Sequence, residues 1–146
     1  MNQNRKLLLA LDLEPESEPL VQRVRDLYFD ELENLHVVHV IREGFYDHGV
    51  SVEASCLDPH IRRQRDHAEM RLRQLLCRYG LTVNCEQMHC IHGEPAFEIK
   101  RLASLLSADL VIVGSHCKQG DWMQLPGATT NCVIQGIGSD VMAVKL

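Results

Sequence analysis

Aromatic side chains are scarce in this chain of 146 residues, since only 5% of them are Phe, Trp or Tyr. Apolar residues still make up 45% of the sequence, so the expected core is mostly aliphatic and large enough for one domain over residues 1–146. Basic residues are outnumbered too: 15 Lys and Arg stand against 20 Asp and Glu, a net charge of -5. Such a chain repels nucleic acid and anionic lipid, so neither is an expected partner.

Long hydrophobic runs are missing as well. The first apolar run, Leu7 to Leu11, is interrupted by Asp12, and no small-residue cleavage site follows it. A signal peptide or a membrane-spanning helix needs a longer run, so a cytoplasmic location is expected. The six cysteines are then expected to be reduced, most of them as small buried hydrophobic residues.

Short apolar segments alternate with helical patterns along the chain. Near-continuous aliphatic runs are typical of strands buried on both faces of a parallel sheet, and amphipathic stretches that start at proline are typical of helices. The sequence predicts strands at 6–13, 35–41, 81–91, 109–114 and 140–146, and helices at 14–28, 58–79, 93–106 and 127–136. Residues 42–57 are predicted to form a loop.

The predicted order, βαβαβαβαβ, defines an α/β fold. Right-handed crossovers turn it into one five-stranded parallel sheet with helices on both faces, a three-layer arrangement. Ligands of such folds bind beyond the carboxyl ends of the strands, where the winding reverses. Those ends fall at Asp12, at Val40 and Ile41, and at Gly114. These positions are the first candidates for a functional site.

The familiar phosphate-binding motifs GxxxxGK[ST] and GxGxxG are absent. The chain instead carries Gly114-Ser115-His116 at a strand end and Gly127-Ala128-Thr129 at an expected helix start. A glycine lets backbone amides approach an anion, and a helix N-terminus adds free N–H groups. The alternative is that these glycines only end a strand and begin a helix.

Taken together, these residues resemble the universal stress protein family. Its nucleotide-binding members carry G-x2-G-x9-G-[ST], and Asp12, His39-Val40-Ile41 and Gly114-Ser115-His116 followed by Gly127 match the family pattern. The similarity covers essentially the whole chain, and the opening ALDLEPES is similar to bacterial A-type members. The resemblance implies a Rossmann-like fold of the adenine nucleotide alpha hydrolase type, with strand order 3-2-1-4-5, and a homodimer.

In the ATP-binding branch of the family, the resemblance implies an adenine nucleotide at these strand ends. Asp12 and Val40 would lie beside the nucleoside, with the backbone of Val40 facing adenine. The ribose and phosphates would be lined by Gly114, Ser115, His116, Gly127, Ala128 and Thr129. The expected cofactor is ATP or another adenine nucleotide, with Mg²⁺ only when ATP binds.

Two positions depart from the nucleotide-binding motif. Cys117 stands at its second glycine, and Ala128 at its serine or threonine. A left-handed cysteine costs about 1 kcal/mol or more, and a lost phosphate hydrogen bond costs a similar amount. ATP binding is therefore expected to be weakened roughly 30-fold or more. A dimeric A-type protein that binds a protein partner and no nucleotide is the alternative, and a slow ATPase is a third possibility.

No catalytic residues are predicted. Asp12 and His116 near a phosphate could form a hydrolytic pair, but the sequence offers no set of nucleophile, base and orienting group. An enzyme is therefore not the favoured class.

No metal site is predicted either. Cys85, His89, Cys90 and His92 lie close together, but alternation along a strand directs Cys85 and His89 to one face and Cys90 to the other. The arginines of the helix at 58–79 are expected to form salt bridges with Asp66 and Glu69 on a solvated face.

Overall fold

The structure is a computed structural model that describes residues 5–42, 58–115 and 128–146. Within these residues five strands form one parallel sheet in the order β3-β2-β1-β4-β5. The predicted order 3-2-1-4-5 is confirmed, with the first and fourth strands adjacent at the centre. The strands are β1 (Leu7–Ala10), β2 (Leu35–Ile41), β3 (Met88–His92), β4 (Leu110–Ser115) and β5 (Asp140–Lys145).

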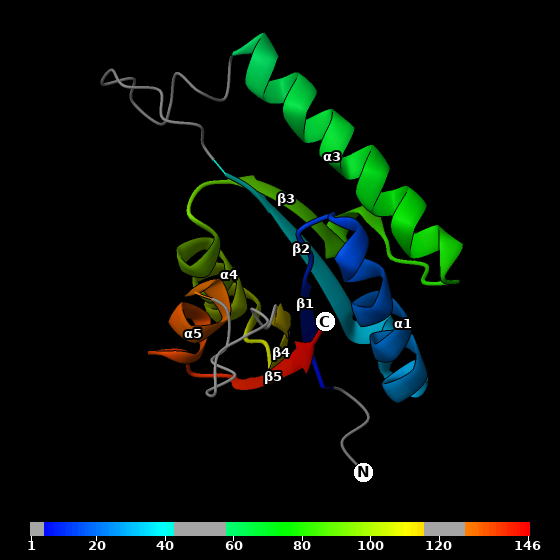
Figure 1. Cartoon of the computed structure of the whole chain (residues 1–146), viewed down its shortest axis with the longest axis vertical. Helices are drawn as coiled ribbons and strands as arrows, with labels where there is room; N and C mark the ends of the chain where they lie inside the picture. The colour runs from blue at the N-terminus through cyan, green and yellow to red at the C-terminus, as the bar shows by residue number, and fades with distance from the viewer. Residues whose placement is uncertain (1–4, 43–57, 116–127) are drawn as a thin grey trace, which may run out of the picture.

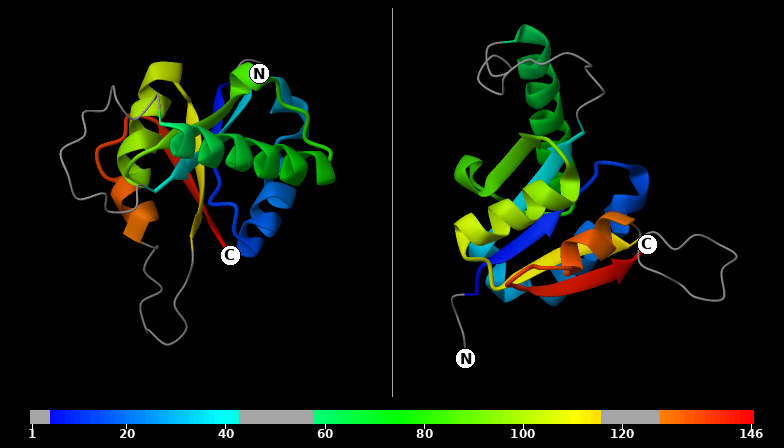
Figure 2. Two further views of the ribbon diagram at one scale, coloured as in Figure 1. Left: turned by 90° about the horizontal axis from the view of Figure 1, so that it is seen from above. Right: turned by 90° about the vertical axis from the view of Figure 1, so that its left-hand side faces the viewer.

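Helices cover both faces of the sheet (Figures 1 and 2). One face carries α1 (Glu18–Leu27) and α3 (Pro59–Arg78), and the other carries α4 (Pro95–Leu106) and α5 (Ala128–Ile134). Leu8 packs in the apolar cluster under α4 and α5, whereas Leu7 and Leu9 pack in the cluster under α1 and α3. Because neighbouring strand residues point to opposite faces, a strand covered on both sides needs the near-continuous apolar run seen in the sequence.

The two longest helices begin at proline, as predicted, and each has an acidic residue as its N-cap. The carboxylate of Asp58 accepts a hydrogen bond from the N–H of His60 (2.8 Å) at the start of α3. At the start of α4, Glu94 accepts from the N–H groups of Ala96 (3.2 Å) and Phe97 (2.7 Å). These side chains bond first-turn N–H groups that have no partner within the helix.

Several predicted boundaries differ from the structure. The strand predicted at 6–13 ends at Ala10, because the chain turns at Leu13, which has a φ of 62°. The helix predicted at 14–28 starts with a 3-10 turn (Pro15–Ser17), and α1 begins only at Glu18, because Pro19 gives a second favourable first turn. A further 3-10 segment, Phe29–Asn34, precedes β2. The strand predicted at 81–91 is shorter, because a 3-10 turn (Cys85–Gln87) lies before β3. Asn84 and Gln87 form a reciprocal cap there, which replaces strand pairing.

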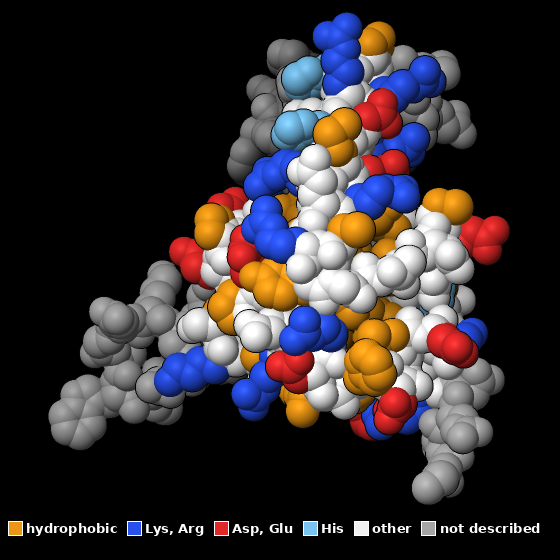
Figure 3. All heavy atoms as spheres, turned by 90° about the vertical axis from the view of Figure 1, so that its right-hand side faces the viewer, with side chains coloured by type: hydrophobic (Ala, Val, Ile, Leu, Met, Phe, Trp, Pro, Cys, Tyr) orange, Lys and Arg blue, Asp and Glu red, His pale blue; other side chains and the backbone are white. Residues whose placement is uncertain are grey.

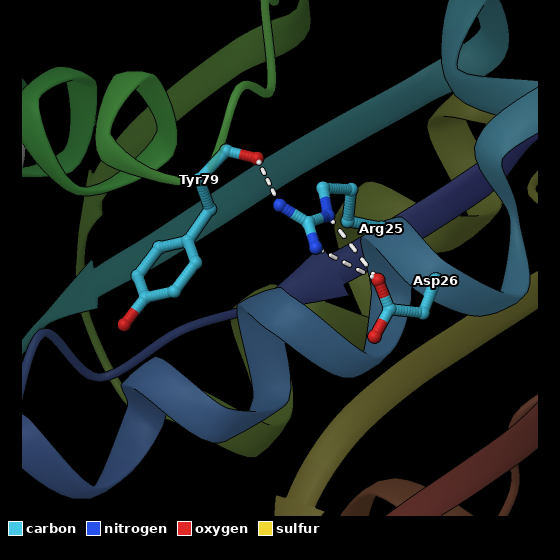
Figure 4. A network of polar contacts seen from close by, with 3 residues as sticks. All are labelled: Arg25, Asp26 and Tyr79. Atoms are coloured by element: carbon cyan, nitrogen blue, oxygen red, sulfur yellow. Dashed lines mark hydrogen bonds and ion pairs between the residues drawn. The ribbon is translucent and has the colours of Figure 1, made fainter.

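The ends of α1 and α3 are joined by polar contacts. Nη1 of Arg25 donates to the carbonyl of Tyr79 (3.4 Å), and the same guanidinium holds Asp26 (Figure 4). Arg78 pairs with one oxygen of Glu18, and the hydroxyl of Tyr79 donates to the other, each at 2.7 Å. The hydrogen bond to Glu18 raises the pKa of Tyr79.

The outer surface of α3 carries many charged side chains (Figure 3). No ion pair joins its arginines to Asp66 or Glu69 within the described part of the chain, so that prediction is wrong for these residues. Exposed pairs contribute little against the entropy of two long side chains. The arginines that do make contacts reach other elements: Arg78 binds Glu18 of α1, and Arg71 donates to the carbonyl of Leu13.

Four cysteines fall within the described residues, and all four are free thiols. Cys77, Cys85 and Cys132 are exposed, so the expectation that most cysteines are buried is wrong for this group. Cys77 and Cys132 lie on helix faces that point to solvent, where a small apolar residue is tolerated. Cys90 is half-buried, and burial raises its pKa to about 11.

None of the described helices has the length and apolar character to span a membrane.

Ser107 provides a direct test of backbone strain in this fold. It ends α4 with a φ of 52°, in the left-handed region that favours glycine. We expect Ser107→Gly to raise the free energy of unfolding by about 0.5 kcal/mol, because relief of the strain outweighs the added freedom of the unfolded chain. The matched control is Ser104→Gly, inside α4, which should lower it by about 0.5 kcal/mol. Urea denaturation measures both, and a loss of stability in both variants would contradict the assigned conformation.

Candidate functional site

A cavity of about 670 Å³ opens at the carboxyl ends of β1, β2 and β4. The sheet winding reverses between β1 and β4, which is where this class of fold binds its ligands. A larger hollow of about 800 Å³ lies at the opposite edge, between the residues that precede the strands. Its lining is mostly polar, and it lies away from the strand ends, so we assign the candidate site to the cavity at the carboxyl ends.

Most of the predicted site residues meet in this cavity. Asp12, Val40, Gly114, Ala128 and Thr129 all line it. Ser115 is buried at the end of β4 but does not line the cavity. His116 and Gly127, and also Cys117, lie outside the described residues.

The turn between β1 and α1 forms one wall and is held in an unusual conformation. One carboxylate oxygen of Asp12 accepts from the N–H of Glu14 (3.1 Å) and from the hydroxyl of Ser17. Leu13 has a φ of 62°, which costs a residue with a Cβ about 1–2 kcal/mol. Its side chain is buried, and its carbonyl accepts from Nη2 of Arg71 at 2.8 Å. These contacts hold the strained turn and fix Asp12 at the cavity wall.

The strands β1 and β2 separate at the same point. Their last rung joins the N–H of Leu11 to the carbonyl of Val38 (2.9 Å). The next rung of a parallel ladder would join the N–H of Val40 to the carbonyl of Leu11. That carbonyl instead lies 2.8 Å from Nδ1 of His39, and the described residues contain no bond between Val40 and Leu11. Because a carbonyl oxygen can only accept, Nδ1 of His39 is the donor.

The peptide groups of Val40 therefore face the cavity. The next carbonyl, that of Ile41, accepts from the N–H of Gly93 (3.1 Å), on the β3 side of the strand. Peptide groups of successive strand residues point alternately to the two neighbouring strands, so those of Val40 point to the β1 side. Since β1 ends at Ala10, the N–H and C=O of Val40 form an open donor and acceptor pair at the cavity.

Burial is the main reason why the pKa of His39 is lowered. The hydrogen bond to Leu11 and the carboxylates of Asp12 and Glu14 act in the opposite direction, and Arg71 adds to the lowering. The imidazole is therefore neutral near pH 7, with the proton on Nδ1 and a lone pair on Nε2.

Gly114 is explained first by packing. A Cβ at this position would lie 2.6 Å from Cδ1 of Leu146 and 3.3 Å from Cδ2 of Leu20. Its carbonyl accepts from the hydroxyl of Thr130 (3.0 Å), which connects β4 to α5. A larger residue at the end of β4 would displace the Leu146 side chain, so packing favours a glycine there whether or not a ligand approaches it.

Arginine side chains at the cavity were missed in the sequence. Nη2 of Arg42 lies 3.5 Å from the hydroxyl oxygen of Thr129, at the side of the cavity formed by α5. Arg71 reaches the cavity from α3. The only local signal for such residues is a polar side chain next to an apolar strand, as Arg42 is; nothing in the sequence around Arg71 indicates its contact with a distant turn.

The histidine and cysteine group near β3 does not assemble as a metal site. His89 lies beside His36 of β2, with Nδ1 of His36 3.2 Å from Nε2 of His89 and the ring planes 17° apart. Cys85 belongs to the 3-10 turn and not to the strand. Within the described residues, no group of three or more His, Cys, Asp or Glu could hold a metal ion.

An open parallel sheet with a cavity at its winding reversal defines a Rossmann-like α/β class of protein. The universal stress protein family model matches residues 3–145, and the chain belongs to this family. Universal stress protein A homolog 2 of Coxiella burnetii is 29% identical over 154 residues, which cover 100% of this chain and 98% of that protein. The resemblance drawn from the sequence is therefore confirmed.

Two solved structures show the same fold. A Pseudomonas aeruginosa UCBPP-PA14 chain assigned as a universal stress protein is 22% identical with a TM-score of 0.66, over 98% of this chain and 48% of that chain. The present chain thus spans about half the length of that protein. A universal stress protein in complex with cAMP is 17% identical with a TM-score of 0.60, over 99% of this chain and 98% of that chain.

Three partly buried imidazoles predict how stability depends on pH. Burial is the first cause of a lowered pKa in His36, His39 and His89. A histidine with a lower pKa in the folded state binds fewer protons there than in the unfolded state. The free energy of unfolding should therefore fall as the pH drops below the unfolded value of about 6.5.

Urea titrations at about pH 7 and about pH 5 test this prediction. Replacing His36 and His89 together by Gln should flatten the pH dependence, because two lowered pKa values are removed. The control is replacement of His60 and His67, which are exposed on α3, by Gln. An equal flattening in the control protein would contradict the assignment.

Proposed function

We propose that this universal stress protein binds an adenine nucleotide weakly in the cavity at the carboxyl ends of β1, β2 and β4, as a stress-response regulator. The observation that carries the proposal is the open backbone pair of Val40. Adenine presents its amino donor beside a ring-nitrogen acceptor, which complements one N–H and one C=O from a single residue. The carboxylate of Asp12 lines the same cavity and suits ribose hydroxyls, which donate hydrogen bonds.

The opposite side of the cavity suits the phosphates. Arg42 brings a guanidinium next to the hydroxyl of Thr129, and arginine binds phosphate oxygens through charge-assisted hydrogen bonds. The complex of one structural relative with cAMP supports an adenine nucleotide as the class of ligand. Ser115, His116, Gly114 and Gly127 complete the proposed phosphate side only through the family motif. Mg²⁺ would bind only together with ATP.

The two departures from the motif explain why the proposed binding is weak. Ala128 lines the cavity without a hydroxyl. Both Cys117 and Ala128 fall at positions that serve the phosphates in the motif, so base recognition is less affected than triphosphate recognition. A specific observation also favours the interaction-protein alternative: Leu146 packs against Gly114 and lines the cavity, as an apolar group near the proposed phosphate side. We propose no catalytic residue, because no nucleophile with a base and an orienting group is in place among the described residues.

Calorimetry with adenosine and ATP tests the proposed function. We expect adenosine and ATP to bind the natural protein with similar, weak affinity. Cys117→Gly combined with Ala128→Ser should strengthen ATP binding by about 2 kcal/mol, because a backbone strain and a hydrogen bond are both restored. Adenosine has no phosphate and is the internal control, so its affinity should change much less. If neither ligand binds either protein, the interaction-protein alternative is preferred.

We also propose that the 146 residues form one domain that assembles as a homodimer through β5. This strand lies at the edge of the sheet, and its apolar side chains Val141, Met142 and Val144 are only half-buried. An unpaired apolar edge is a liability unless it is covered or paired. Two copies related by a two-fold axis would pair their β5 strands antiparallel.

A single proline tests this dimer. The N–H groups of Asp140 and Leu146 donate to the carbonyls of Asp109 and Ser115. The backbone N–H groups of even-numbered residues in β5 therefore point toward β4. The N–H of Ala143 then points away from the sheet. Ala143→Pro should convert the dimer to a monomer in sedimentation velocity with the fold retained, because it removes only an outward donor. Ala143→Thr keeps the donor and should remain dimeric. A folded proline variant that is still a dimer would show that β5 is not the interface.

A further inference from the structure

We propose that His39 is a positioning residue that keeps the backbone N–H of Val40 open for a ligand. It does so by donating from Nδ1 to the carbonyl of Leu11, which is the acceptor that the next rung of the sheet would use. The inference rests on the proposed function, because it assigns the open Val40 to adenine recognition. It adds a residue whose side chain need not touch the nucleotide.

The competition centres on the carbonyl of Leu11. Leu11 is buried, and a buried carbonyl without a hydrogen-bond partner is unfavourable. Two donors are available to it from β2: the ring of His39 and the N–H of Val40. In the structure the ring is the donor, at 2.8 Å. Removal of the ring leaves the N–H of Val40 as the neighbouring donor on the strand.

The path of the chain after Leu11 favours the same arrangement. A continued ladder would also join the N–H of Leu13 to the carbonyl of Val40. Leu13 instead adopts its left-handed conformation, and Arg71 holds its carbonyl. The strand is therefore turned away from β2 at Leu13, while His39 holds the point of separation at Leu11. Both contacts keep the donor and acceptor of Val40 away from β1.

Hydrogen exchange of individual backbone amides in isotope-labelled protein tests this inference directly. In the natural protein without ligand, the amide of Val40 should exchange rapidly, whereas that of Leu11 should be protected by its bond to Val38. In His39→Ala, the N–H of Val40 should form its hydrogen bond to the carbonyl of Leu11. Exchange of the Val40 amide should therefore be slower by about tenfold or more. A purely structural loss would instead speed exchange at both amides.

Two further variants make the result specific. His39→Asn places an amide N–H close to the position of Nδ1 and should restore rapid exchange at Val40. His36→Ala removes an imidazole from the other face of β2, where it contacts His89, and should leave Val40 unchanged. His39→Leu retains the bulk of the ring without a donor and should slow exchange at Val40, as expected for His39→Ala. It takes the place of the alanine variant if that variant does not fold.

Adenosine binding completes the experiment. The affinity for adenosine should fall about tenfold in His39→Ala and recover in His39→Asn, because the closed rung competes with the base. A protected Val40 amide in the natural protein without ligand would overturn the inference, and so would unchanged exchange in both His39→Ala and His39→Leu. If the Val40 amide responds as expected but adenosine does not bind, the proposed function fails and His39 is left as a residue that separates two strands.

Discussion

The parallel pairing of β1 with both β2 and β4 is the constraint on which the site depends. Residues Leu7 to Ala10 bond to a neighbour on each side, and both of their faces are covered by helices. A strand in that position cannot shift without exposing apolar side chains or breaking two ladders. The end of β1 is therefore fixed in space. The cavity begins just beyond it, where the carbonyl of Leu11 accepts a hydrogen bond from the side chain of His39 and not from the backbone of β2.

The turn after β1 shows how the sheet makes a binding surface from backbone groups. If the chain continued as a strand, the peptide groups of Val40 would be used in the ladder. The turn at Leu13 avoids this at the cost of a left-handed residue, and contacts from Arg71 of α3 and from Ser17, at the end of the 3-10 turn before α1, offset that cost. The strained residue lies beside the proposed nucleoside position. The same turn that carries the strain therefore keeps the cavity open.

The sequence was sufficient for the sheet order because the order depends on strong, local signals. Aliphatic runs give the strands, amphipathic stretches that start at proline give the helices, and crossover handedness gives the topology. The same reasoning failed where a distant partner decides. The turn at Asn84 replaced a strand through a side-chain cap, and Cys77 and Cys132 are exposed although cysteine is usually buried. The contact of Arg71 with Leu13 joins residues far apart in sequence, and no local pattern predicts it.

The site itself was predictable to different degrees for its two sides. Asp12 and Val40 could be located because strand ends in a parallel sheet meet at one edge. The role of Gly114 is less clear from its motif than from its packing, since Leu146 already occupies the space that a Cβ would need. A glycine that packing already favours is weak support for phosphate binding by itself. The charge of Arg42 is the stronger indication on that side, because it brings a guanidinium next to Thr129 in the lining of the cavity, and a guanidinium binds phosphate oxygens well.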